Sequence, residues 1–203
     1  MKAHTQFTQE NLTPKDAHEI LVEGNARFVN NLKANRDLKN QVLETSKGQY
    51  PFAVILSCID SRVPAELVFD QGIGDVFSAR VAGNIINTDI LGSMEYACKI
   101  AGSKIVVVMG HTKCGAVISS CQHVELGNIT SLLDRIKPIV IAFEEKGITL
   151  EGDAVEEVAA ENVKQSIRQI RKLSPILKEM EDDGEIEIVG AMYDVNSGVV
   201  DFY

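Results

Sequence analysis

Three apolar segments in the first half of the chain have the pattern of short β-strands. Residues 52–57 and 105–109 are almost continuous apolar runs, which is typical of strands that are buried on both faces. Residues 75–79 form a third, shorter candidate between them. Segments with helical periodicity separate these runs, and strands that alternate with helices predict a mostly parallel central sheet flanked by helices, the α/β class.

A helix is predicted close to the N-terminus. Residues 13–16 (TPKD) combine a hydroxyl N-cap, a proline at the first helical position and a carboxylate in the first turn. Apolar residues then recur at helical spacing over about five turns; they are Ala17, Ile20, Leu21, Phe28 and Leu32. The polar residues 35–48 predict a short helix and a loop. We expect residues 1–48 to form an N-terminal helical arm that packs on a partner subunit.

Further helices are predicted between and after the strand candidates. Thr88 is the expected N-cap of a helix that runs to Lys99, and a long periodic segment covers residues 153–173. Residues 129–146 have helical character that Pro138 interrupts. The charges on these helices are expected to lie on solvated faces.

The C-terminal segment predicts a hairpin at the edge of the sheet. Residues 185–194 alternate apolar and polar side chains, and Asn-Ser-Gly at 196–198 turns the chain into residues 199–203. No internal repeat or linker interrupts the sequence. Residues 1–203 are therefore predicted to form a single domain.

The charge balance narrows the functional classes. The chain of 203 residues has 20 basic and 29 acidic side chains, a formal net charge of −9, and its longest basic run is the dipeptide Arg171-Lys172. Binding to nucleic acid phosphates or to an anionic membrane surface is not expected, because both need clustered cations. No segment reaches the roughly 20 apolar residues of a membrane span, and the first residues lack the apolar region of a signal peptide. We expect a cytoplasmic protein.

The chemistry is concentrated after two of the predicted strands. Cys58-Ile59-Asp60-Ser61-Arg62 follows the first apolar run, and the segment from His111 to Cys114 follows the run at 105–109. The carboxyl ends of parallel strands meet at one edge of a sheet, so these segments can converge. Thiolate and imidazole ligands suit zinc. Core thiols and an ordinary histidine at a strand end remain the alternative.

The same residues carry a family resemblance. Cys58-x-Asp60-x-Arg62 followed by His111-x-x-Cys114-Gly115 resembles the signature of the β-class carbonic anhydrases, and the resemblance extends from about residue 49 to residue 117. It implies a β-carbonic anhydrase-like fold with one zinc ion per subunit, bound by Cys58, His111 and Cys114. Asp60 is then either a fourth ligand in a closed form or is held by Arg62 in an open form.

The resemblance implies reversible hydration of carbon dioxide to bicarbonate and a proton. Three protein ligands leave a fourth zinc position at which water can be converted to a hydroxide nucleophile. Two thiolates cancel the charge of the metal, so we expect activity to rise toward alkaline pH. Arg62 can hold Asp60 through a two-pronged hydrogen bond and orient it toward that hydroxide, which makes Asp60 and Arg62 the predicted catalytic pair.

Four further positions match the family's substrate pocket. Gln49 resembles a polar group beside the substrate, and Phe77, Ala82 and Tyr96 resemble the apolar wall. From the residues alone, Phe77 and Tyr96 would be interpreted as core residues. The family's cleft lies at a subunit interface, so the resemblance implies a homodimer or a homotetramer.

Two other functions use the same residues. Relatives of this family hydrolyse carbonyl sulfide or carbon disulfide with an indistinguishable zinc set. A zinc ion with four closed ligands could also be purely structural in a non-catalytic protein. Arg62 argues against the structural role, because a permanently ligating Asp60 needs no competing guanidinium two residues away.

One position departs from part of the family. Some members have a regulatory bicarbonate site that contains a tryptophan three residues before the first zinc cysteine, together with an arginine. Ile55 occupies that tryptophan position here, although Arg80 matches the arginine, and the chain has no tryptophan. Inhibition by bicarbonate through this site is not expected.

Overall fold

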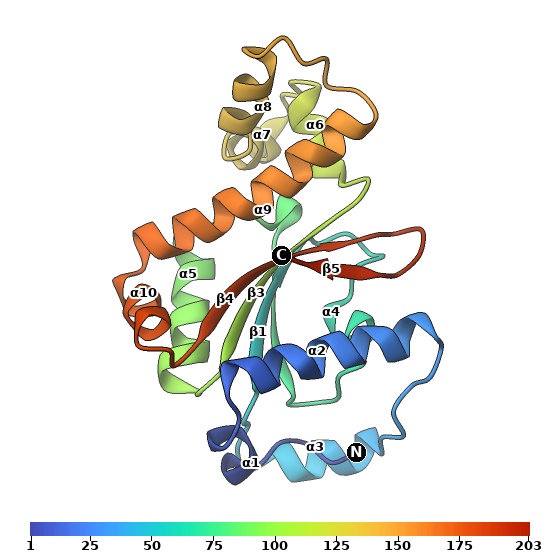
Figure 1. Cartoon of the computed structure of the whole chain (residues 1–203), viewed down its shortest axis with the longest axis vertical. Helices are drawn as coiled ribbons and strands as arrows, with labels where there is room; N and C mark the ends of the chain where they lie inside the picture. The colour runs from blue at the N-terminus through green and yellow to red at the C-terminus, as the bar shows by residue number, and fades with distance from the viewer.

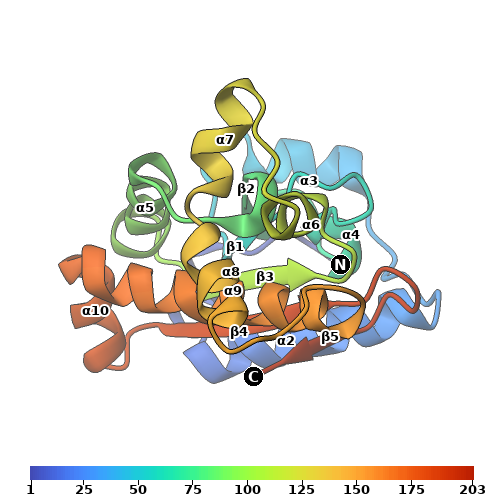
Figure 2. The ribbon, with the colours of Figure 1, turned by 90° about the horizontal axis from the view of Figure 1, so that it is seen from above.

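A five-stranded sheet forms the centre of the protein in a computed structural model that describes residues 1–203. The strands are β1 (Ala53–Ser57), β2 (Val76–Arg80), β3 (Ile105–His111), β4 (Glu187–Tyr193) and β5 (Val200–Phe202). Their order is β2-β1-β3-β4-β5, with β5 antiparallel to β4 and all other pairs parallel (Figure 2). The predicted α/β class, the mostly parallel sheet and the hairpin at its edge are confirmed.

Ten α-helices surround the sheet. They are α1 (Gln6–Glu10), α2 (Pro14–Val29), α3 (Leu38–Thr45), α4 (Ala65–Val68), α5 (Thr88–Glu95), α6 (Gly115–Cys121), α7 (Gly127–Leu133), α8 (Lys137–Glu144), α9 (Asp153–Leu173) and α10 (Pro175–Asp182). A 3-10 turn (Ala82–Asn84) follows β2, and a π-helical turn (Tyr96–Ile100) extends α5. Figure 1 shows α6, α7 and α8 together at one end of the molecule and α1, α2 and α3 toward the other.

Alternate residues of the strands build two separate apolar cores. Ala53 and Ile55 of β1 pack in a cluster that includes residues of α2 and α4, whereas Val54 and Leu56 pack with α5, α9 and α10. Successive side chains of a strand point to opposite faces of the sheet. Both faces of β1 are therefore covered, which explains why its residues are apolar from Ala53 to Leu56.

Helix α2 confirms the predicted N-cap. The Thr13 hydroxyl accepts a hydrogen bond from the backbone N–H of Asp16, and the Asp16 carboxylate accepts one from the backbone N–H of Thr13. Ala17 and Leu21 are fully buried against this chain's own sheet. The predicted extension to Leu32 is wrong, because the helix ends at Val29 and Leu32 is 66% exposed beyond it.

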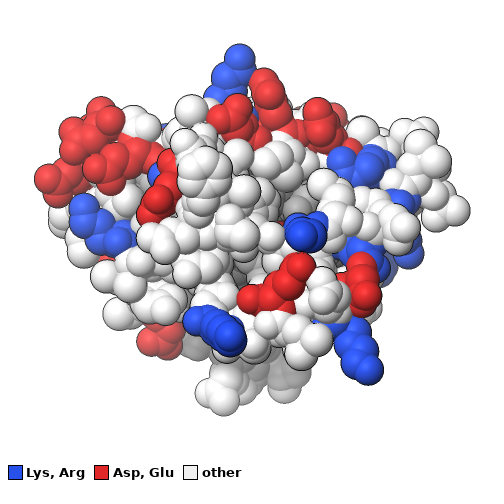
Figure 3. Space-filling view, turned by 90° about the horizontal axis from the view of Figure 1, so that it is seen from below, with Lys and Arg blue, Asp and Glu red and all other residues white.

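No helix of the structure is both long and apolar enough to cross a membrane. Figure 3 shows the molecule from below, with acidic side chains gathered at the left of the view, where α10 lies, and basic side chains interspersed with acidic ones elsewhere. Helix α10 and the residue after it contribute Glu179, Glu181, Asp182 and Asp183.

Candidate metal centre

Three potential metal ligands meet at the carboxyl edge of the sheet. Cys58 directly follows β1, His111 is the last residue of β3, and Cys114 is the N-cap of α6. One ligand atom from each lies within 4.8 Å of the others, and all three residues are buried. The predicted convergence of the two segments is confirmed, because β1 and β3 are parallel neighbours in the sheet.

The donor atoms fit a zinc ion. The sulfur atoms of Cys58 and Cys114 are 4.0 Å apart, close to the roughly 3.8 Å expected for two thiolates on one tetrahedral zinc and far beyond a disulfide bond. His111 Nδ1 lies 2.9 Å from the Thr112 carbonyl oxygen, while His111 Nε2 is buried without a hydrogen-bond partner. A ring whose Nδ1–H donates to a carbonyl presents Nε2 as a free ligand atom.

The two thiols share one hydrogen bond that separates their pKa values. The pKa of Cys58 is lowered, first because the Cys114 thiol donates to its sulfur and further because the Gly83 backbone N–H donates to it. The pKa of Cys114 is raised because it donates that proton and because it is buried. The pair loses its first proton readily, and a bound cation would favour loss of the second.

Asp60 is oriented by Arg62. Arg62 Nε and Nη2 donate to Asp60 Oδ1 and Oδ2 at 2.9 and 2.7 Å, and the Arg62 backbone N–H also donates to Oδ1 at 2.9 Å. These hydrogen bonds hold the pKa of Asp60 well below its usual range, despite partial burial, so the carboxylate stays ionised. Asp60 is not part of the group formed by Cys58, His111 and Cys114.

The loop between His111 and Cys114 is held by hydrogen bonds to the backbone N–H and the carbonyl of Lys113. Lys113 has a φ of +55°, which is rare for a residue with a side chain. Its backbone N–H donates to the Glu156 carboxylate at 3.0 Å, and its carbonyl accepts from Arg62 Nη2 at 3.3 Å. Arg62 therefore connects Asp60 to the Cys114 loop.

A glycine turn contacts the Cys58 sulfur. The Gly83 backbone N–H donates to Cys58 Sγ at 3.3 Å. Gly83 has a φ of +68°, and a Cβ atom there would lie 2.8 Å from Ile136 Cδ1, so any other residue would strain the backbone and displace the Ile136 side chain. Two buried residues of α9 bind the same turn: Asn162 Nδ2 donates to the Gly83 carbonyl at 2.7 Å, and the Ser166 hydroxyl donates to the Asn84 carbonyl at 3.1 Å.

Arg80 also donates hydrogen bonds to the segment from Cys58 to Asp60. Its Nε donates to the Cys58 carbonyl at 2.9 Å and its Nη2 to the Asp60 carbonyl at 2.7 Å. Ile55 is fully buried in β1. The guanidinium that matches the regulatory arginine thus holds backbone carbonyls here.

The four predicted pocket residues lie in two places. Ala82 packs in the apolar cluster that contains Cys58 and Cys114. Phe77 pairs with Val54 in the sheet. Val54 precedes Cys58 by four residues, so Phe77 lies about 13 Å from the level of Cys58 along the strand direction. Within one chain, only Ala82 is beside the metal ligands.

The other pocket residues line cavities away from the ligand group. Phe77 and Tyr96 are in edge-to-face contact, with ring centroids 6.2 Å apart, and border one groove of about 710 Å³. Gln49 and Tyr96 border a neighbouring groove of about 440 Å³. Neither groove is lined by Cys58 or His111.

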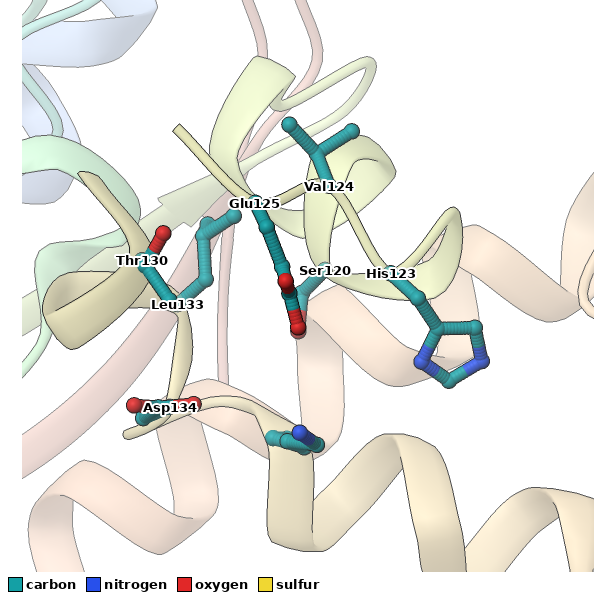
Figure 4. Close-up of a pocket in the computed structure, with 8 residues that line it drawn as sticks. Ser120, His123, Val124, Glu125, Thr130, Leu133 and Asp134 are labelled. Carbon is teal, nitrogen blue, oxygen red and sulfur yellow. The ribbon is translucent and has the colours of Figure 1, made fainter. Parts of the chain in front are cut away.

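A separate small pocket lies where α6, α7 and α8 meet. Figure 4 shows it lined by Ser120, Glu125 and Asp134, while the imidazole of His123 points away from them. His123 Nε2 lies 2.8 Å from Glu144 Oε1, and half of its side chain is exposed. His123 is therefore a surface residue of this structure.

The remaining cysteines are separate from the ligand group. Cys98 is buried in the core between α5 and the sheet, and burial raises its pKa to about 12. Cys121 is half-buried and packs at the edge of the apolar cluster that contains Cys114. Both are free thiols, as expected of packing residues.

The residues of α9 that support the ligands are not evident from the sequence. Glu156, Asn162 and Ser166 lie in a charged helix, in which polar residues are usually solvated. A signal was present: positions 158, 162, 166 and 170 recur every four residues, so Asn162 and Ser166 fall within the apolar stripe of the helix.

Comparison with known proteins identifies the family. The carbonic anhydrase family profile matches residues 53–200. A carbonic anhydrase of Mycolicibacterium smegmatis is 33% identical over 198 residues, which cover 94% of each chain. The fold is also similar to that of two crystal structures. The β-carbonic anhydrase CafA of Aspergillus fumigatus has a TM-score of 0.74 and 28% identity, with 81% of each chain covered. A tetrameric β-carbonic anhydrase of Sordaria macrospora has a TM-score of 0.72 and 25% identity, with 81% of this chain and 89% of the other covered. The chain therefore belongs to the β-class carbonic anhydrase family.

Proposed function

We propose that this enzyme uses one zinc ion per subunit to interconvert carbon dioxide and water with bicarbonate and a proton. The buried Cys58, His111 and Cys114 would hold the metal, and the unpartnered His111 Nε2 is the single observation that carries this assignment. When bound, zinc acidifies water and so supplies a nucleophile near neutral pH. Three protein ligands are typical of a catalytic zinc site, and four are typical of a structural one.

Asp60 and Arg62 are the proposed catalytic pair. The carboxylate is ionised and lies outside the three-ligand group, which supports the open form rather than the closed one. In this state Asp60 accepts a hydrogen bond from the attacking water and fixes its direction toward carbon dioxide. Arg62 keeps the carboxylate in place through two parallel hydrogen bonds.

The substrate cleft is proposed to form between two subunits. Gln49, Phe77 and Tyr96 border grooves that exclude the metal ligands of their own chain. A second copy that placed these residues beside Ala82 and the metal would complete an apolar pocket, which suits a nonpolar gas. The tetrameric relative of Sordaria macrospora supports a homodimer or homotetramer.

The N-terminal arm is proposed to contribute to this assembly. Apolar side chains on its outer surface remain exposed; they are Phe7, Leu32, Leu38, Val42 and Leu43. Burial of such residues by a second copy would remove apolar area from water. We further propose that residues 1–203 act as one domain in the cytoplasm, where the free thiols stay reduced.

A rate comparison on different gases tests the proposed reaction. Zinc-loaded protein is expected to hydrate carbon dioxide far faster than it hydrolyses carbonyl sulfide or carbon disulfide. The Cys58→Ser variant, which lacks one metal ligand, is the control and should lose both zinc and turnover. Faster hydrolysis of carbonyl sulfide or carbon disulfide would overturn the assignment of the substrate but not of the metal site.

A further inference from the structure

Helix α9 is connected to the Cys58 sulfur by two hydrogen bonds, both of which involve the backbone of Gly83. Asn162 lies in the middle of this helix, is 2% exposed, and donates from Nδ2 to the Gly83 carbonyl at 2.7 Å. On the other side of the same Cα atom, the Gly83 N–H donates to Cys58 Sγ at 3.3 Å. The two hydrogen bonds therefore clamp Gly83 between the helix and the sulfur.

We propose that Asn162 is a positioning residue that aims the Gly83 N–H at the Cys58 thiolate and so sets how strongly this sulfur binds the metal. The inference rests on the proposed zinc site. A hydrogen bond to a thiolate withdraws electron density from sulfur and orients its lone pairs, and outer groups of this kind tune the metal in many proteins.

The geometry of the turn makes an external clamp necessary. Gly83 has a φ of +68°, and Asn84, which follows it, has a φ of +42°, a value that is strained for a residue with a side chain unless its surroundings hold it. The turn is only three residues long, from Ala82 to Asn84, so its internal hydrogen bonds cannot fix it alone. A buried amide donor is suited to this task because an unpaired Gly83 carbonyl would be costly.

Ser166 provides a matched comparison one helical turn away. It is equally buried, at 2% exposure, and its hydroxyl donates to the carbonyl of the next residue, Asn84. Loss of this hydroxyl removes one buried hydrogen bond between the same helix and the same turn. It leaves the direct bond from Asn162 to Gly83 in place.

The test compares Asn162→Ala, Asn162→Leu and Ser166→Ala after zinc is replaced by cobalt(II). In both Asn162 variants we expect the sulfur-to-cobalt charge-transfer band to move to longer wavelength, because electrons on a thiolate without its N–H donor are more easily transferred. Zinc affinity, measured against a chromogenic chelator, should fall about 10-fold or more, because the Cys58 lone pairs are then no longer oriented toward the metal. Ser166→Ala should leave the band in place.

Several outcomes would overturn the inference. An unshifted band in folded Asn162→Leu, or an equal shift in Ser166→Ala, would reduce Asn162 to a packing role. Asn162→Leu fills the site with a side chain of similar size, so it decides the test if Asn162→Ala does not fold. Failure of both variants to fold would also assign Asn162 to folding alone. Absence of the band in the unmodified protein would instead contradict the metal site on which the inference rests.

Discussion

At the scale of single residues, Arg62 is the group on which the proposed chemistry depends most. It donates to both carboxylate oxygens of Asp60 and to the Lys113 carbonyl. Replacement by lysine keeps the charge but removes the planar pair of donors. We expect Arg62→Lys to retain zinc and to lose turnover by about 100-fold, because small errors in the placement of a catalytic group have effects of that size. Stopped-flow hydration assays with metal analysis measure both quantities.

The control is a second arginine that also pairs with a carboxylate. Arg168 donates to Glu161 at 2.6 Å on the surface of α9. Arg168→Lys should leave turnover unchanged. Near-full activity of Arg62→Lys would show that Asp60 needs no rigid partner.

Arg80 and Ile55 lead to a separate prediction about bicarbonate. The Arg80 guanidinium already donates to the Cys58 and Asp60 carbonyls, and Ile55 stands where a regulatory site would need tryptophan. We expect bicarbonate to inhibit only as a reaction product, with a Hill coefficient of about 1. A titration with steep, cooperative inactivation would contradict this reading of Arg80.

At the scale of elements, the strands and most helices were predictable because each follows a local rule. Strands β1 and β3 are apolar except at their carboxyl ends because helices cover both of their faces. Helix α2 begins at Pro14, as predicted, because its N-cap hydrogen bonds involve only the nearby residues Thr13 and Asp16. The expected cap at Thr88 is wrong: Asn87 is the N-cap, since its side chain accepts from the Ile90 N–H. Thr88 and Asn87 are both good caps, so sequence alone did not separate them.

The supports of the candidate site were less predictable than its ligands. Cys58, His111 and Cys114 are rare residue types that lie at or just after the ends of two neighbouring strands, so their convergence follows from topology. Asn162 touches Gly83, which is 79 positions away in the chain. No local pattern specifies such a contact, which depends on how α9 lies against the loops.

The N-terminal segment is joined to the rest of the fold by a buried carboxylate. Asp70 pairs with Arg27 and Arg36, each at 2.6 Å, and accepts from the Ala34 N–H at 3.1 Å. We expect Asp70→Asn to lower the free energy of unfolding by about 3 kcal/mol at pH 7, because it leaves two arginines without their partner. Urea denaturation measures this change, and Asp182→Asn at the exposed pair with Lys178 should cost less than about 1 kcal/mol.

The ion pairs of Asp70 with Arg27 and Arg36 also predict that the free energy of unfolding depends on pH. Burial opposes ionisation of Asp70, but the hydrogen bonds from Arg27, Ala34 and Arg36 outweigh it, so the pKa of Asp70 is lowered in the folded protein. Its contribution to stability is therefore complete above the unfolded pKa of about 4 and is lost as the pH falls through the lower folded value. The stability difference between the unmodified protein and Asp70→Asn should narrow below pH 4. A constant difference at all pH values would contradict the role of the charge.

At the scale of the whole molecule, the proposed cleft between two subunits predicts that two defective subunits can complement each other. Arg62→Ala damages the metal side of a cleft, and Phe77→Ala damages the wall that a partner subunit would supply. If the two variants assemble at random into dimers, half of the dimers are mixed and one of their two clefts is intact. We expect about one quarter of the unmodified activity to return on mixing.

The control combines two variants that damage the same side of the cleft. A mixture of Arg62→Ala with Asp60→Asn should recover nothing, because no cleft then has an intact metal side. Failure of Arg62→Ala and Phe77→Ala to complement, in mixed oligomers verified by mass, would show that each chain builds its cleft alone.

The central claim is that Cys58, His111 and Cys114 hold a zinc ion that supports carbon dioxide hydration. The most direct test is stopped-flow hydration from pH 6.5 to 9, with zinc content measured in the same samples. We expect one zinc per chain and turnover that rises toward alkaline pH, because two thiolates neutralise the metal and leave it less acidifying than a three-histidine site. Absence of turnover at pH 9 in fully zinc-loaded protein would contradict the account.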